Sequence, residues 1–295
     1  MVGLRHKAES SPQEAKDVKM KIKLKGNNQI RSFRQVAERL VSKITASNNI
    51  AGVILLGGLA RGFADKYSDV DIIVLFNKED NPLRRQIHDM SLEERKSSGL
   101  DIDLEIHCLN AFQRWKWNET NRWDFSHAEI VHDPEEQIRK LLDERLKVSQ
   151  EFWVKRIVTC AEYMKWYCCP PTRNIGTIAE AWVHRGDLIS AHYCLNYSID
   201  LIIKTVFALN KEFLPPPKWR LFYFQNLNWL PSNYRLLKAT IELKGLTVED
   251  LNRRLKNLRK IWQKILVKVQ EETGLSSDRI SSYYVERILH QTPVH

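Results

Sequence analysis

The spacing of apolar residues changes near the middle of the chain. In the first third, apolar positions form short runs or alternate with polar ones, and this predicts strands over 52–56, 70–76 and 100–108. From about Glu135 onward, apolar residues recur every three or four positions, as on one face of a helix. An earlier amphipathic helix is expected over 31–46. The pattern therefore predicts a mixed α/β part followed by a helical part.

The strand expected over 100–108 has one apolar and one polar face. Its even-numbered positions are apolar or cysteine, whereas its odd-numbered positions from 101 on are Asp101, Asp103, Glu105 and His107. Because successive side chains of a strand point to opposite faces, we expect these polar groups on one side of the sheet.

We divide the chain into three segments on this basis. Residues 1–30 contain five lysines between Lys16 and Lys25 and no aromatic residue, and we expect a mobile basic arm there. Residues 31–147 are expected to form the α/β domain with a short mixed sheet. Residues 148–295 are expected to form an α-helical domain that closes over the substrate.

Composition narrows the class of protein. The chain has 295 residues, of which 43% are hydrophobic and 28% charged, so global disorder is excluded. The longest apolar runs, 51–60 and 72–76, are shorter than the roughly 20 residues that span a bilayer, so we expect no membrane partner. The five cysteines lack the paired spacing of a metal site or a disulfide framework, which favours a cytoplasmic location.

The net charge of +10 makes an anionic partner plausible, and the charge is uneven. Residues 149–295 hold 21 basic and 13 acidic residues, a net charge of +8. A helix expected over 248–269 carries Lys256, Lys260, Lys264 and Lys268 at i, i+4 spacing. This stripe is either a solvated helix face or an electrostatic track for RNA.

One stretch carries candidate chemistry. The first apolar strand ends in Gly57-Gly58, and the second begins with Asp69 and Asp71, two positions apart. The two carboxylates therefore leave the same face and repel each other unless a cation lies between them. Glycines at a strand end let backbone amides approach an anion closely. Together these features suit a nucleoside triphosphate with Mg²⁺.

This arrangement resembles the signature of the DNA polymerase β-like nucleotidyltransferase superfamily. The match covers residues 50–108, with Gly57, Gly58, Asp69 and Asp71 in the expected types and spacing. It departs at Gly58, where many members of the superfamily have a serine. The layout is most similar to the antibiotic-modifying branch that includes kanamycin nucleotidyltransferase.

The resemblance implies roles for further residues. A third carboxylate on a later strand corresponds to Glu105, with Asp103 as the second choice and Asp101 as a rim residue. The resemblance also implies that Glu162, on a helix of the second domain, is the base for the acceptor hydroxyl. Asp69, Asp71 and Glu105 would bind two Mg²⁺ ions.

The phosphates of ATP or another nucleoside triphosphate are expected near the glycine turn. Gly57, Gly58 and Arg61 would contact them, whereas Ser68 is expected to shape the turn before Asp69 and to reach a phosphate only secondarily. The expected reaction moves a nucleoside monophosphate to a hydroxyl of a small, aminoglycoside-like acceptor and releases pyrophosphate. The alternatives are transfer to RNA or protein, as in toxin-like relatives, and a non-catalytic nucleotide-binding protein. A homodimer is possible under the same resemblance.

Overall fold

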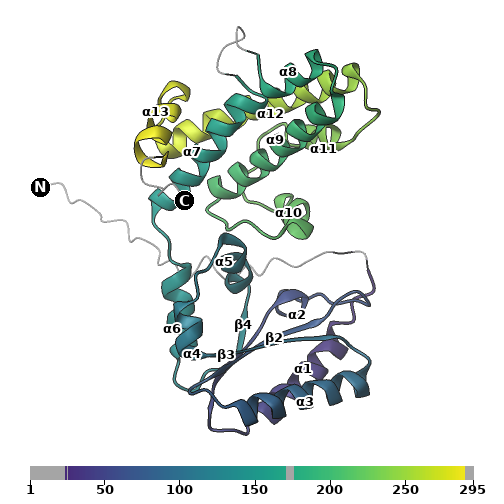
Figure 1. Cartoon of the computed structure of the whole chain (residues 1–295), viewed down its shortest axis with the longest axis vertical. Helices are drawn as coiled ribbons and strands as arrows, with labels where there is room; N and C mark the ends of the chain where they lie inside the picture. The colour runs from purple at the N-terminus through teal and green to yellow at the C-terminus, as the bar shows by residue number, and fades with distance from the viewer. Residues whose placement is uncertain (1–23, 25, 171–175, 290–295) are drawn as a thin grey trace, which may run out of the picture. The chain divides into compact units, whose positions relative to one another are not determined.

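The computed structural model describes residues 24, 26–170 and 176–289. The predicted basic arm over 1–30 therefore lies largely outside the described residues. The chain divides into two compact units, one made of residues 1–115 and 127–140, and the other of 116–126 and 141–295. Figure 1 identifies the elements of each unit, and we describe the units separately.

The first unit is built on a four-stranded mixed sheet with the order β3-β2-β1-β4. Strand β2 pairs antiparallel with β1 and parallel with β3, and β1 also pairs antiparallel with β4. The mixed α/β class predicted from the sequence is confirmed. The strands are β1 (Ile50–Leu55), β2 (Val70–Phe76), β3 (Ile102–Cys108) and β4 (Glu129–His132).

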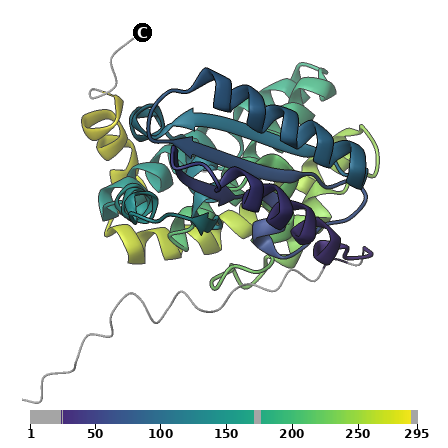
Figure 2. The same ribbon diagram turned by 90° about the horizontal axis from the view of Figure 1, so that it is seen from below.

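Helices α1 (Ile30–Ile44) and α3 (Asn81–Ser98) cover one face of this sheet (Figures 1 and 2). Alternate residues of β2 point into this core, because the strand has a period of two. Helix α3 connects the parallel strands β2 and β3, as a parallel connection requires. Its N-cap is Asp80, whose carboxylate accepts a hydrogen bond from the amide of Leu83. The carboxylates of β2 and β3 consequently lie on the face turned away from α1 and α3.

A buried glutamate links α3 to two half-exposed cations of α1. Glu94 on α3 is only 4% exposed, and its Oε1 lies 2.8 Å from Nε of Arg39 on α1. Nζ of Lys43 lies 3.5 Å from the other carboxylate oxygen. The buried carboxylate of Glu94 thus has its charge met by two cations, as a buried charge requires. These ion pairs therefore link the two helices that support the sheet.

Two local features differ from the sequence pattern. Strand β4 was not predicted, because its four residues have no clean alternation and it forms by pairing with the edge of β1. Helix α4 (Leu109–Arg114) lies outside the segments in which the apolar pattern predicts a helix, and it ends at Trp115 in an extended conformation. The short helices α2 (Gly57–Arg61) and α6 (Gln137–Leu146) complete the elements that begin in this unit.

Among its described residues, the second unit contains helices joined by loops and no strand. Helix α12 buries the predicted apolar stripe, including Leu251, Leu258, Trp262 and Ile265. Its N-cap is Thr247, whose hydroxyl accepts a hydrogen bond from the amide of Asp250. The helices are α5 (Glu119–Ser126), α7 (Gln150–Tyr167), α8 (Ile178–His184), α9 (Leu188–Leu209), α10 (Pro217–Phe224), α11 (Arg235–Ile241), α12 (Val248–Thr273) and α13 (Ser277–Arg287).

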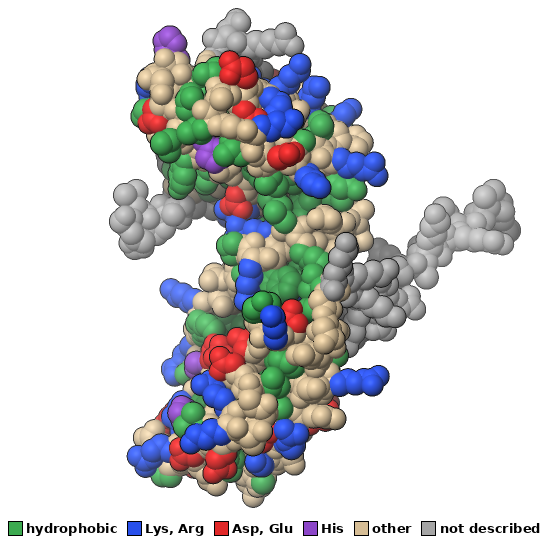
Figure 3. Space-filling model, turned by 90° about the vertical axis from the view of Figure 1, so that its right-hand side faces the viewer, with side chains coloured by type: hydrophobic (Ala, Val, Ile, Leu, Met, Phe, Trp, Pro, Cys, Tyr) green, Lys and Arg blue, Asp and Glu red, His purple; other side chains and the backbone are tan. Residues whose placement is uncertain are grey.

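Basic residues of the second unit have several different environments. Arg254 is fully buried and donates to the backbone oxygen of Thr240, to Asn196 Oδ1 and to Nδ1 of His192, at 2.6–2.7 Å. On the face drawn in Figure 3, Lys and Arg side chains are spread over the surface with acidic groups among them. At least one positive charge of residues 149–295, that of Arg254, therefore stabilises the fold and is not available to a partner. Within the described part of the chain, no helix has both the length and the apolar character needed to cross a membrane.

Candidate functional site

Three carboxylates converge where β2 and β3 begin. Asp71 lies on β2, Asp69 directly precedes that strand, and the parallel register places Asp103 of β3 opposite Asp71. One carboxylate oxygen from each of the three lies within 4.8 Å of the others. The sheet thus brings together groups that are 32 residues apart in sequence. Such a spacing suits a shared cation.

The electrostatics of the cluster favour a cation. Burial raises the pKa of Asp103, and the negative charges of Glu105, Asp69 and Asp101 raise it further, against the opposing effect of Arg95. A divalent cation among the carboxylates would remove this penalty by favouring their charged forms. The donors are all carboxylate oxygens, which are the ligands that Mg²⁺ prefers. The residues therefore fit a magnesium site.

The glycine turn lies directly against this cluster. Gly57 has a φ of +59°, and a Cβ built on it would overlap Oδ2 of Asp71. The amide of Leu56 donates to the backbone oxygen of Asp71 at 3.1 Å, so the turn and the carboxylate are joined. A Cβ on Gly58 would overlap the carbonyl oxygen of Phe63. The close approach of that carbonyl accounts for glycine at the position where many members of the superfamily have serine.

Substitution of Gly57 by alanine should damage both the fold and the site. The left-handed backbone costs a non-glycine residue about 1–2 kcal/mol, and the new methyl group must also displace the Asp71 carboxylate. We expect Gly57→Ala to lower the urea midpoint and to abolish any Mg²⁺-dependent stabilisation by ATP.

A matched control exists at Gly99, which has a φ of +72° and no atom within 4 Å of the place that a Cβ would take. Gly99→Ala carries the backbone cost alone, so it should lower the urea midpoint but keep the Mg²⁺-dependent effect of ATP. Equal behaviour of the two variants in the ATP measurement would show that the contact between Gly57 and Asp71 is unimportant for the site.

The other residues predicted near the phosphates lie around the turn. Ser68 Oγ accepts a hydrogen bond from the amide of Asp65 at 3.0 Å and lies 3.3 Å from its carboxylate. Ser68 thereby holds the loop that delivers Asp69. Arg61 is the last residue of α2 and is half-buried. Its contact with a triphosphate stays a prediction.

The third carboxylate of the group is Asp103, the second choice from the sequence. Glu105, which the resemblance favoured, is not in the group of three; its Oε2 lies 3.0 Å from Nε2 of His107, and its side chain is 50% exposed. Asp103 takes the place opposite Asp71 because parallel pairing fixes the register, and Glu105 comes two residues later on the strand. Asp101 is exposed and ion-paired with Arg95 at 2.6 Å, as suits a rim residue.

His107 is a neighbour that the sequence reasoning passed over. Its ring centroid lies 5.9 Å from that of Trp115 and 6.4 Å from that of Phe112. These aromatic contacts and the Glu105 carboxylate orient the imidazole. The alternating pattern of 100–108 already placed His107 on the carboxylate face, although its spacing to other histidines indicates neither a metal ligand nor a triad base.

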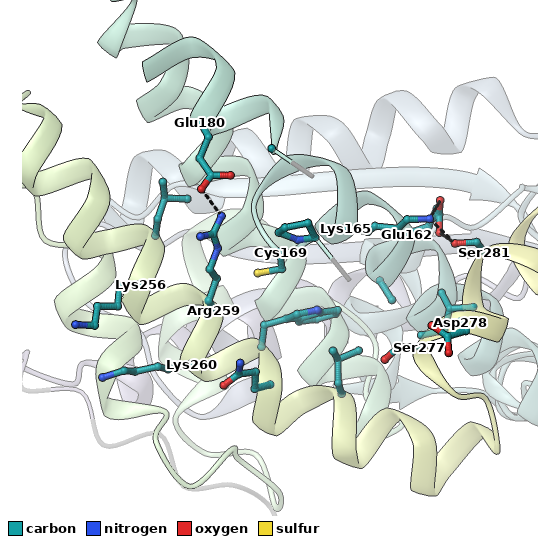
Figure 4. Close-up of a pocket in the computed structure, with 18 of the residues that line it drawn as sticks. Glu162, Lys165, Cys169, Glu180, Lys256, Arg259, Lys260, Ser277, Asp278 and Ser281 are labelled. Carbon is teal, nitrogen blue, oxygen red and sulfur yellow. Dashed lines mark hydrogen bonds and ion pairs between the residues drawn. The ribbon is translucent and has the colours of Figure 1, made fainter. Parts of the chain in front are cut away.

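Glu162 belongs to the helical unit. It lies on α7 and is 9% exposed, and it accepts hydrogen bonds from Ser281 Oγ at 2.7 Å and Trp166 Nε1 at 2.9 Å. Lys165 Nζ lies 3.7 Å from the same carboxylate. This carboxylate lines a cavity of that unit (Figure 4). Its predicted role as a base stays a prediction.

Comparison with known families identifies a segment that includes most of the first unit. Residues 33–148 match the family described as the nucleotidyltransferase domain. These residues form a nucleotidyltransferase domain. The polymerase β-like resemblance seen in the sequence is confirmed, while the antibiotic-modifying branch stays a prediction. No curated protein matches the chain significantly.

Solved structures show distant likenesses. A nucleotidyltransferase-like protein from Exiguobacterium sibiricum 255-15 aligns with a TM-score of 0.42 and 12% identity, over 81% of this chain and 77% of that one. A mutant of the toxin–antitoxin pair MntA–HpeT aligns with a TM-score of 0.31 and 14% identity, over 43% of this chain and 98% of that one. The tri-AMPylated HEPN toxin of Shewanella oneidensis in complex with MNT antitoxin aligns with a TM-score of 0.28 and 14% identity, over 46% and 99%. At TM-scores below 0.5, these likenesses do not identify an acceptor.

Proposed function

We propose that the nucleotidyltransferase domain transfers a nucleoside monophosphate, most simply AMP from ATP, to a hydroxyl group of a small molecule. The observation that supports this most directly is the group of three carboxylates within 4.8 Å, with Gly57 packed against Asp71. Asp69, Asp71 and Asp103 would hold Mg²⁺. When bound, the metal neutralises triphosphate charge and favours loss of the proton from the attacking hydroxyl.

The reaction balances without a further co-reactant. The hydroxyl oxygen of the acceptor forms a bond to the α-phosphorus, and the bond from that phosphorus to the bridging oxygen of the β-phosphate breaks. Pyrophosphate leaves, with its charge met by the backbone amides of Gly57 and Gly58 and by Arg61. Positioning and electrostatics supply most of the rate acceleration in such a transfer.

The hydroxyl proton needs an acceptor near the cluster. We assign this role to Glu105, which is two residues beyond Asp103 on the same face of β3 and therefore roughly 7 Å along the strand. Its carboxylate is accessible and is held by His107 at 3.0 Å. Glu162, the base implied by the antibiotic-modifying branch, is the second candidate.

The test uses ATP labelled at either the α- or the γ-phosphate. We expect α-label, and not γ-label, to appear on a small hydroxyl compound when the full chain is incubated with Mg²⁺ and a metabolite extract, and EDTA should abolish the transfer. The labelled products are separated by size. Label found only on RNA or protein would contradict the small acceptor, and transfer of the γ-label would contradict nucleotidyl transfer itself.

A further inference from the structure

The glycine turn lies between the end of strand β1 and the short helix α2. Strand β1 ends at Leu55, which is paired with Glu129 of β4, and α2 begins at Gly57. Because Gly57 and Gly58 form the start of α2, the direction of their amides depends on how α2 is held against the end of β1. The N-cap residue Leu56 has no side-chain group that can hydrogen-bond to the helix. Contacts from outside the turn are therefore needed to hold it.

One arginine of α1 contacts both sides of this turn. Arg34 Nη2 lies 2.7 Å from Oε2 of Glu129, and Nη1 lies 3.1 Å from Oε1, so the guanidinium donates two hydrogen bonds to this carboxylate. Nη2 also donates to the backbone oxygen of Leu59 in α2 at 3.3 Å. The planar guanidinium fixes the direction as well as the distance of such contacts. A single side chain thus joins the residue paired with the end of β1 to the middle of α2.

The residues just before α1 hold the loop that follows α2. Asn28 donates from Nδ2 to the backbone oxygen of Gly62 at 3.2 Å, and its Oδ1 accepts from the amide of Ala64 at 3.2 Å. The amide of Phe63, within the same loop, donates to the backbone oxygen of Gly58 at 3.0 Å. The glycine turn is therefore joined through this loop to the start of α1, in addition to its link through Arg34.

Arg34 would act through the turn and not on a phosphate directly. Its guanidinium is engaged by the Glu129 carboxylate and the Leu59 carbonyl. The side chain of Leu59 is fully buried, so α2 is held by the core through this side chain and by Arg34 through the carbonyl. The carboxylates of β2 and β3 have a different support, because the pairing of those two strands sets their positions. Loss of Arg34 should therefore loosen the turn more than it loosens the carboxylate group.

We propose that Arg34 is a positioning residue for the glycine turn. By holding α2 against the end of β1, it fixes the direction in which the amides of Gly57 and Gly58 point. The proposal rests on the part of the proposed function in which these amides meet the phosphates of the nucleotide. It predicts a selective effect, in which loss of Arg34 weakens binding of the triphosphate much more than binding of the metal. Asn28 would have a smaller share in the same role.

The test is calorimetric titration of the full chain with α,β-methylene-ATP in the presence of Mg²⁺. This analogue has a carbon atom between the α- and β-phosphorus atoms, so it binds as a triphosphate but cannot lose pyrophosphate, and no acceptor is needed. We expect Arg34→Gln to weaken its binding at least ~10-fold, since a small misplacement of a positioned group has effects of this size or larger. The affinity for Mg²⁺ alone should stay within about twofold of the native value, as expected for an independent site.

The matched control is Arg39→Gln, which removes an arginine from the same helix. Arg39 is ion-paired with Glu94 of α3 and not with a residue beside the turn. This variant should keep the affinity for the analogue within about twofold of the native value. A second variant, Glu129→Gln, breaks the same link from its other end and should also weaken binding of the analogue. Because both changes break one link, the effects of Arg34→Gln and Glu129→Gln should not add in the double variant.

The outcomes separate this inference from the proposed function. Near-native binding of the analogue by Arg34→Gln would overturn the inference and leave the transfer reaction standing. Equal weakening by Arg34→Gln and Arg39→Gln, or equal loss of affinity for Mg²⁺ and for the analogue, would show that Arg34 supports only the fold and would also overturn it. Failure of the native chain to bind the analogue with Mg²⁺ would overturn both the inference and the proposed function.

Discussion

Asp71→Asn should abolish nucleotidyl transfer while leaving the protein folded. Asp71 sits between Asp103 across the sheet and Gly57 in the turn, so it is the central member of the carboxylate group. Mutation of a group that only hydrogen-bonds to a metal ligand typically lowers metal affinity or activity ~10–100-fold. Loss of the ligand itself should therefore lower the transfer rate at least ~10²-fold. Asparagine has the same shape and removes a negative charge, so the melting temperature without metal should be equal or slightly higher.

The measurement pairs the transfer rate with thermal unfolding. For the native chain, a nucleotide at 100 times its dissociation constant contributes about 2.7 kcal/mol to stability. We expect this gain from ATP to require Mg²⁺ and to disappear in Asp71→Asn. Near-native turnover by the variant would disprove the assignment of Asp71, whereas a lost fold would show up directly as a lower melting temperature without ligand.

Asp103→Asn should be more damaging than Glu105→Gln in its effect on metal binding. Asp103 lies in the group of three carboxylates and Glu105 does not, so only Asp103→Asn should remove the Mg²⁺-dependent stabilisation by ATP. Glu105→Gln should keep that stabilisation and slow the transfer by ~10²-fold, as expected for loss of a general base. Asp101→Asn, on the rim, is the control and should change little.

The pH dependence of Mg²⁺ binding is a second test of whether Asp103 or Glu105 is the third metal ligand. Because the pKa of Asp103 is raised by burial and by its acidic neighbours, protons compete with the metal at this group from a higher pH than at an ordinary aspartate. Apparent Mg²⁺ affinity should therefore fall as the pH is lowered, both in the native chain and in Glu105→Gln, which keeps Asp103. If Glu105→Gln removes metal binding and Asp103→Asn does not, the third ligand is Glu105, as the resemblance implied, and the assignment of Asp103 is wrong.

The pattern of apolar and polar residues along the chain was sufficient to predict most helices and strands and part of the candidate site. The alternation in 100–108 and the apolar run 70–76 correspond to β3 and β2, and the heptad-like spacing in 248–269 lies within α12. The pair Asp69 and Asp71 was found because a period of two places neighbours on one face, a property of the strand itself. Strand β4 was missed, because a short edge strand forms by pairing with a neighbour more than by its own pattern.

Tertiary structure determined which residues far apart in sequence lie close together. The choice between Asp103 and Glu105 depends on the register between two parallel strands, and a shift of two residues preserves the face while moving a side chain by roughly 7 Å. Likewise, the four lysines of α12 are equivalent in sequence, yet two line a cavity and one is bound by glutamates. Sequence period determines the face of an element, whereas packing between elements determines which groups on that face meet a partner.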